Sequence, residues 1–307
     1  MNLAVLIPCH NEAETIGKVI DDFRRELPDA EIYVYDNKST DDTARIAREH
    51  GAKVCFCLRL GKGRVIRQMF NEINADIYIM VDGDDTYRAR DVHKLIEPVS
   101  TGACDMCVGN RLVNYSPGSF PLLHIFGNKL IRFLTHKLYR EKVDDMLSGY
   151  RVMNRTLVGD LCLISGGFEI ETEINIQTIW HGFRIKSLPT RYSGRPPGSV
   201  SKIRTLGDGY RILATLFTLL REYQPVTAGG LIFSVLALIG LILLIIGWSG
   251  GSFFLFTIGV LLILLGFLIV CTGVVLHSIN ISNREGAEQR RKLFRNYKIN
   301  ISEGHGK

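Results

Sequence analysis

The chain has 307 residues, of which 46% are hydrophobic, and a formal net charge of +6. This apolar content is sufficient for a folded core and excludes a mainly disordered chain. The charge is too small to indicate a nucleic-acid-binding protein by itself. The seven cysteines are odd in number and have apolar neighbours, which favours reduced, buried thiols over a disulfide framework.

Short apolar runs alternate with amphipathic stretches through the first part of the chain. Strands are expected at residues 3–7, 31–36, 53–58, 77–81 and 106–110. Helices are expected between them, and Asn11 is the expected N-cap of the first helix, which should end near Leu27. This order, with its short connections, predicts an α/β domain in which helices cover both faces of a mostly parallel sheet.

Three carboxylates follow the apolar run at 77–81. Asp82, Asp84 and Asp85 surround Gly83, which allows a tight turn. Open α/β sheets bind their ligands at the carboxyl ends of strands, and clustered carboxylates suit a hard cation such as Mg²⁺ or Mn²⁺. The pattern therefore predicts a metal site that also binds substrate phosphate. An acidic helix-capping loop is the alternative for so short a motif.

Polar residues also follow the first two predicted strands. His10 and Asn11 follow the first strand, and Asp36 and Asn37 follow the second. The carboxyl ends of parallel strands share one edge, so these residues are expected to converge on the acidic cluster. Lys62 opens a further helix, where it would face a nucleotide phosphate. A solvated basic turn explains Lys62 equally well.

Two long stretches near the C-terminus, residues 226–247 and 253–276, contain no charged residue. Each is long enough to cross a bilayer, and the five residues between them are too few for a domain, so the pair is expected to form a transmembrane hairpin. Basic residues lie outside the hairpin and none lies in its turn. This places the N-terminal domain and both termini in the cytoplasm.

The predicted organisation has four parts. They are a cytosolic catalytic domain at 1–200, an interfacial amphipathic helix at 201–224, the hairpin at 225–277 and a basic cytosolic tail at 278–307. A further amphipathic helix is expected at 122–139, either as a core-facing helix or on a membrane surface. Glycines repeat every seven residues in the hairpin, which favours close packing within it or between the subunits of a homo-oligomer.

Four motifs together resemble family 2 glycosyltransferases with the GT-A fold. They are Ile7-Pro8-x-x-Asn11-Glu12, Asp36-Asn37-x-Ser39-x-Asp41, Asp82-Gly83-Asp84 and Asp145 to Arg151. The last motif, the basic loop from Arg191 to Lys202 and the hairpin are together similar to the branch that uses polyprenyl phosphate. This branch includes dolichyl-phosphate mannose synthase and undecaprenyl-phosphate glucosyltransferases. The family often has Leu-Gln after the second aspartate, where this chain has Asp85-Thr86, so a third metal ligand is not identified.

The resemblance implies an inverting, membrane-bound glycosyltransferase. It would move a hexose or N-acetylhexosamine from a nucleotide sugar to polyprenyl phosphate, for cell-envelope glycan or glycoprotein assembly. A UDP-sugar is the first expectation for the donor and GDP-mannose the second. The alternatives are a non-catalytic, membrane-anchored scaffold that binds nucleotide sugars, and a polysaccharide synthase.

The resemblance also implies residue roles. The expected nucleotide-sugar site comprises Pro8, Asn11, Glu12, Asp36, Asn37, Lys62, Asp82 and Gly83. The expected ligands of Mg²⁺ or Mn²⁺ are Asp82 and Asp84. The expected catalytic residues are Arg111 and Arg151, which would neutralise phosphate charge, and Asp145 or Asp144 beside the transferred sugar. The expected lipid-phosphate site comprises Arg191, Arg195, Ser201 and Lys202.

Overall fold

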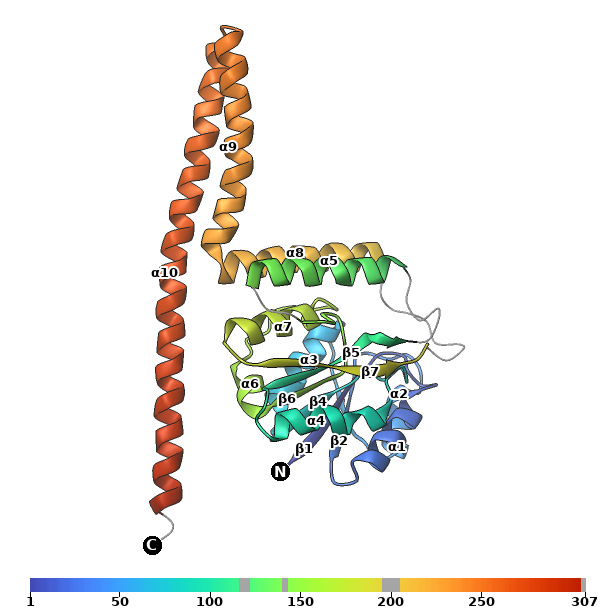
Figure 1. The fold of residues 1–307 in the computed structure, drawn as a ribbon. Helices are drawn as coiled ribbons and strands as arrows, with labels where there is room; N and C mark the ends of the chain where they lie inside the picture. The colour runs from blue at the N-terminus through green and yellow to red at the C-terminus, as the bar shows by residue number, and fades with distance from the viewer. Residues whose placement is uncertain (116–121, 140–142, 195–204, 305–307) are drawn as a thin grey trace. The chain divides into compact units, whose positions relative to one another are not determined.

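The computed structural model describes residues 1–115, 122–139, 143–194 and 205–304. The chain divides into two compact units, Met1–Leu216 and Phe217–Lys307. The first unit contains a mixed α/β fold, and the second contains two long helices (Figure 1).

One seven-stranded sheet forms the centre of the first unit, in the order β3-β2-β1-β4-β6-β5-β7. The strands are β1 Leu3–Cys9, β2 Glu31–Asp36, β3 Lys53–Phe56, β4 Ile77–Met80, β5 Met106–Tyr115, β6 Arg151–Asn154 and β7 Ile185–Tyr192. Strand β6 runs antiparallel to both of its neighbours, β4 and β5, while the other pairings are parallel. The prediction of a mostly parallel sheet is confirmed.

Helices cover both faces of this sheet (Figure 1). Those of the first unit are α1 Ile16–Glu26, α2 Thr43–Glu49, α3 Lys62–Glu72, α4 Val92–Ser100, α5 Leu122–Tyr139, α6 Arg155–Asp160 and α7 Ile170–Trp180, and α8 Thr205–Tyr223 begins there. Side chains alternate along a strand, so Val5 and Ile7 pack with α1 and α4, while Ala4 and Leu6 pack with α3 and α7. Two apolar layers therefore fix the strand ends on which the candidate site is built.

The connection after β1 differs from its prediction. Helix α1 begins at Ile16 with Thr15 as its N-cap, so the assignment of Asn11 as N-cap was wrong. Asn11 has φ +53°, and its Oδ1 accepts a hydrogen bond of 2.7 Å from the backbone N–H of Thr40. Strands β1 and β2 are neighbours, so the loops that follow them meet, and the Asn11 side chain joins these loops.

The second unit consists mainly of helices α9 Pro225–Ser249 and α10 Phe253–Gly304. By length and composition, Pro225–Ser249 and Phe253–Asn283 are candidate membrane spans, with mean hydropathies of 2.9 and 3.0. Glycines bring the two helices together: a Cβ on Gly240 would lie 2.7 Å from the carbonyl oxygen of Gly259, and the reverse contact would be 2.6 Å. The glycines at these two positions therefore serve packing within the hairpin.

Candidate active site at the carboxyl edge of the sheet

The loops after β1, β2 and β4 are bonded to one another. The backbone N–H of Asn37 donates to the carbonyl of Cys9 over 2.8 Å, and Nδ1 of His10 lies 2.8 Å from the carbonyl oxygen of Asn37. The Thr15 hydroxyl donates to the carbonyl of Gly83 over 2.7 Å. The polar residues after these strands therefore share one edge of the sheet.

The residues predicted to hold the nucleoside lie in these loops. Asp36 is buried, and its Oδ1 accepts a 2.7 Å hydrogen bond from the backbone N–H of Ser39. The amide of Asn37 donates to the carbonyls of Cys57 and Arg59 and accepts from the N–H of Gly61. Asn37 thus fixes the loop that leads into α3. Pro8 and Glu12 belong to the same edge, where Glu12 is nearly buried.

The three carboxylates after β4 point to different partners. Asp84 is only 3% exposed, and its Oδ1 accepts a 2.6 Å hydrogen bond from the Thr86 hydroxyl. Asp82 is more accessible and forms a 2.5 Å ion pair with Lys62. Asp85, with φ +55°, pairs instead with Lys18 of α1 at 2.6 Å. Asp85 is therefore directed to the surface of α1, apart from the Lys62 pair.

The carboxylate oxygens of Asp82 and Asp84 are suitable ligands for a divalent cation. Carboxylate oxygens are hard ligands, and Mg²⁺ in enzymes is commonly held by one or two carboxylates together with substrate phosphates and water. Among the described residues, no group of three or more His, Cys, Asp or Glu is placed to hold a metal ion. The remaining coordination positions would therefore be filled by water or by oxygens of a bound diphosphate, and the two ligand assignments stay predictions.

Lys62 bridges two carboxylates from different elements. Its Nζ lies 2.5 Å from Asp82 Oδ1 and 2.6 Å from Glu171 Oε1 of α7. Burial would lower the pKa of Lys62, but the charges of Asp82 and Glu171 outweigh it and hold the pKa above its ordinary value. Glu171 was not singled out from the sequence. Its position within the acidic stretch 169–173 was the only available signal.

The start of α3 is packed tightly against the loop before α7. A Cβ on Gly61 would lie 2.1 Å from the carbonyl oxygen of Gly166, and one on Gly63 would lie 2.3 Å from that of Ser165. Glu173 of α7 holds this loop, because its carboxylate accepts 2.8 Å hydrogen bonds from the N–H groups of Ile164 and Ser165. The glycines beside Lys62 therefore permit close packing, and this packing fixes the backbone position of Lys62.

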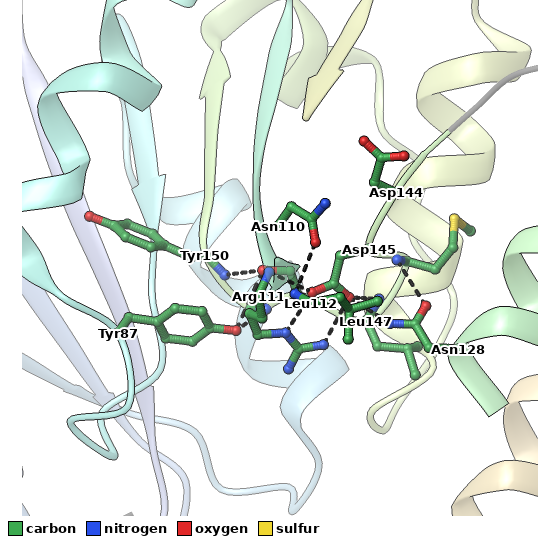
Figure 2. A network of polar contacts seen from close by, with 12 residues as sticks. Tyr87, Asn110, Arg111, Leu112, Asn128, Asp144, Asp145, Leu147 and Tyr150 are labelled. Atoms are coloured by element: carbon green, nitrogen blue, oxygen red, sulfur yellow. Dashed lines mark hydrogen bonds and ion pairs between the residues drawn. The ribbon is translucent and has the colours of Figure 1, made fainter. Parts of the chain in front are cut away.

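A second polar cluster surrounds Asp145 (Figure 2). Arg111, on β5, donates from Nε to Asp145 Oδ2 at 2.7 Å and from Nη2 to Oδ1 at 3.0 Å. Asn128 of α5 and the backbone N–H of Leu147 also donate to Oδ1. Burial would raise the pKa of Asp145, but the Arg111 charge and these hydrogen bonds hold it below its ordinary value.

The two candidate acids, Asp144 and Asp145, have opposite environments. Asp145 is fully buried and both of its oxygens are bonded, whereas Asp144 is exposed and its side chain points away from Arg111 (Figure 2). A substrate would therefore reach the carboxylate of Asp144 without disturbing the Arg111 pair. Which of the two lies nearest the sugar stays open.

Arg151 lies in the interior rather than at the exposed edge. Its guanidinium donates to the carbonyls of Ser148 and Met146 and to the amide oxygen of Asn175 on α7. Burial lowers its pKa to about 10. These contacts join the 146–148 loop to α7, and the implied role of Arg151 in neutralising phosphate charge stays a prediction.

Two tyrosines that the sequence analysis did not select complete the site. The Tyr87 hydroxyl accepts a 2.8 Å hydrogen bond from the N–H of Gly149, and the guanidinium of Arg111 lies 5.5 Å from the ring centroid of Tyr192. Gly149 in turn lies against Asp82, since a Cβ there would be 2.3 Å from Asp82 Oδ2. This glycine therefore brings the Arg111–Asp145 cluster next to the acidic edge.

The predicted lipid-phosphate residues are only partly described. Arg191 on β7 is exposed, and its backbone N–H donates to Asp91 over 2.8 Å. Arg195, Ser201 and Lys202 lie outside the described residues.

Comparison with known proteins gives one family. The model described as glycosyl transferase family 2 matches residues 4–162. The glycosyltransferase AglJ of Haloferax volcanii is 35% identical over 224 residues, which is 73% of each chain. The protein RfbJ of Shigella flexneri is 50% identical over 113 residues, covering 37% of this chain and 88% of RfbJ.

A solved structure has the same fold. Glucosyl-3-phosphoglycerate synthase from Mycobacterium tuberculosis, in complex with Mn²⁺, uridine diphosphate and glucosyl-3-phosphoglycerate, aligns with a TM-score of 0.59 and 26% identity. The alignment covers 71% of this chain and 79% of that one.

Proposed function

This chain belongs to glycosyl transferase family 2, and from that premise we propose that it transfers a hexose or N-acetylhexosamine from a nucleotide sugar to a polyprenyl phosphate. One observation carries the proposal: a single chain combines the acidic edge at Asp82 and Asp84 with two apolar helices of membrane-spanning length. The first feature suits a diphosphate donor, and the second suits a lipid acceptor.

A UDP-sugar is the favoured donor. Support comes from the similar synthase, whose structure holds uridine diphosphate with Mn²⁺. In this chain the two aspartates would hold the cation, which would withdraw charge from the departing diphosphate when bound. GDP-mannose is the second choice.

A membrane acceptor is supported by the surface as well as by the hairpin. Helix α5 presents the exposed side chains of Lys129, Arg132, Phe133 and Lys137, and α8 presents Tyr210 and Leu213. Basic and apolar side chains on an exposed helix suit the interface of an anionic membrane. We accordingly place the catalytic unit on the cytoplasmic side, where the excess of basic residues outside the hairpin also places it.

The chemistry needs little proton transfer. A phosphate monoester has a second pKa of about 6, so its oxygen is largely ionised at neutral pH and can attack the sugar without a strong base. Direct displacement inverts the anomeric centre. The chain's task is then to hold two anions in line, and Lys62 and Arg111 are two cations whose positions are fixed by ion pairs with Asp82 and Asp145.

The test uses the full-length protein in detergent with radiolabelled UDP-glucose, UDP-N-acetylglucosamine and GDP-mannose. Each donor is offered with polyprenyl phosphate or with 3-phosphoglycerate, in Mn²⁺, Mg²⁺ or EDTA. Metal-dependent label in the organic phase is expected with polyprenyl phosphate. Label only on the soluble acid, or on a long polymer, contradicts the lipid acceptor, and donor binding without any transfer supports the scaffold alternative.

A further inference from the structure

The ammonium group of Lys62 lies between two carboxylates. Its distances are 2.5 Å to Asp82 Oδ1 and 2.6 Å to Glu171 Oε1. The Lys62 side chain is 11% exposed and that of Glu171 is 5% exposed, so water screens this arrangement weakly. One of the two carboxylates is a predicted metal ligand, and the other has no predicted role.

Packing fixes the backbone at Lys62 and Glu171. Gly61 and Gly63 hold the start of α3 against the loop at Ser165 and Gly166. Glu171 lies in the first turn of α7, where residues 170–178 are all buried. The flexible part of the arrangement is therefore the lysine side chain, which can exchange partners while the backbone stays in place.

A divalent cation at Asp82 would compete with this ammonium. Lys62 is bonded to an oxygen of the carboxylate that the metal ion would bind. An ammonium group and a metal ion on the same carboxylate repel each other strongly where water screens them weakly. Glu171 offers the ammonium a second partner that is not a predicted metal ligand. Lys62 can therefore leave Asp82 without losing its whole counter-charge.

We propose, on the basis of the proposed function, that Lys62 occupies the cation position of Asp82 in the donor-free enzyme and that Glu171 positions the displaced ammonium toward the donor diphosphate. Glu171 is thus a positioning residue. The arrangement keeps the affinity for metal low until the donor arrives, because only the diphosphate compensates the charge of both cations. Metal and donor should therefore bind with positive cooperativity.

The decisive variant is the double substitution Lys62→Met with Glu171→Gln. It removes one positive and one negative charge, so the net charge at the site is unchanged. An effect that depended on net charge alone would leave the Mn²⁺ affinity the same as in the wild type. Our inference predicts that Mn²⁺ binds without nucleotide about tenfold more tightly, because Asp82 has lost its competing ammonium.

The measurement is titration of free Mn²⁺ by electron paramagnetic resonance on full-length protein without nucleotide, and again with UDP. The double variant should also bind UDP about tenfold more weakly at saturating Mn²⁺, since the lysine is missing. The matched control is Lys18→Met with Asp85→Asn, which removes the neighbouring 2.6 Å pair between α1 and the loop after β4. Both affinities should stay unchanged in this control.

The single variant Glu171→Gln separates positioning from folding. It leaves Lys62 with Asp82 as its counter-charge in this arrangement, so Mn²⁺ without nucleotide should bind more weakly than in the wild type, while the protein remains folded by circular dichroism. Equal Mn²⁺ affinity in the wild type and the double variant, with wild-type transfer intact, overturns this inference alone. Absence of transfer by the wild type to any acceptor overturns the proposed function instead.

Discussion

The guanidinium of Arg111 contacts both carboxylate oxygens of Asp145, at 2.7 and 3.0 Å, and Asp145 is fully buried. This two-point contact fixes the plane of the guanidinium. Asp145 is thereby committed to Arg111. Its effect on a substrate would pass through the arginine, which is the more accessible member of the pair.

Asp145→Asn should lower the free energy of unfolding more than Asp144→Asn does. The first variant takes the charge of Asp145 away from the largely buried guanidinium of Arg111, at a cost of about 3–5 kcal/mol. The second changes an exposed side chain and should alter stability by less than about 0.5 kcal/mol. Denaturant unfolding of both variants measures the difference.

Transfer assays on the same two variants decide between the candidate acids. If Asp144 lies beside the sugar, Asp144→Asn loses transfer at unchanged stability. Full activity of Asp144→Asn, together with inactivity of a still folded Asp145→Asn, would assign the role to the Arg111–Asp145 pair.

The Asp145 pair also predicts a pH dependence of stability. The pKa of this carboxyl is lower in the folded protein than its ordinary value of about 3.9 in the unfolded chain. Its contribution is therefore complete above that value and is lost as the pH falls through the folded pKa. The stability difference between wild type and Asp145→Asn should narrow below about pH 4. A constant difference from pH 7 to pH 3 would contradict the charge-based account.

Asp84→Asn should abolish metal-dependent transfer while the fold is retained. The amide oxygen of asparagine can still accept from the Thr86 hydroxyl, but a neutral amide binds a divalent cation poorly. A loss of roughly 100-fold or more in turnover is expected, as for other electrostatic groups at a reacting centre. The matched variant Asp85→Asn should stay active, since Asp85 pairs with Lys18. Equal losses in both variants would remove the distinction between these carboxylates.

Local sequence patterns were sufficient to predict the elements that carry the acidic edge. Apolar runs ending in Asp36 and Asp82 identified two parallel strands, and the sharing of one edge by their ends follows from parallel topology alone. The family resemblance then directed attention to Arg111 and Asp145, which the structure joins in one ion pair. The roles of these residues in catalysis stay predictions.

The features that were missed depend on contacts distant in sequence. Glu171 is one of several acids in a helix, and only the packing of α7 against the start of α3 brings it to Lys62. The burial of Arg151 was also missed, because it depends on the pairing of β6 between β4 and β5. Helix α7 is buried on all sides, so its polar residues show no exposed face from which periodicity would identify their partners.

Gly240→Val should destabilise the hairpin of α9 and α10. Gly240 and Gly259 approach so closely that a side chain on either would clash with the other's carbonyl oxygen, at 2.7 and 2.6 Å. Overpacking of this kind costs about 1–3 kcal/mol. Thermal unfolding in detergent measures the loss. Gly230→Val on the same helix is the control, because a Cβ there meets nothing within 4 Å. Equal effects would show that helix propensity, rather than the contact, determines stability.

Gly149→Ala tests whether the loop before β6 shapes the acidic edge. The new methyl group would lie 2.3 Å from Asp82 Oδ2 and 2.8 Å from Oδ1, so the carboxylate must rotate and lose its 2.5 Å contact with Lys62. We expect transfer to fall by about 100-fold, because a displaced ligand misplaces the diphosphate. The fold should be retained, since the clash falls on a side chain. Gly159→Ala in α6 has nothing within 4 Å and should preserve transfer, with stability equal or higher by about 1 kcal/mol. Wild-type transfer by Gly149→Ala would mean that the position of Asp82 is not critical, and the metal-ligand assignment would then have to be abandoned.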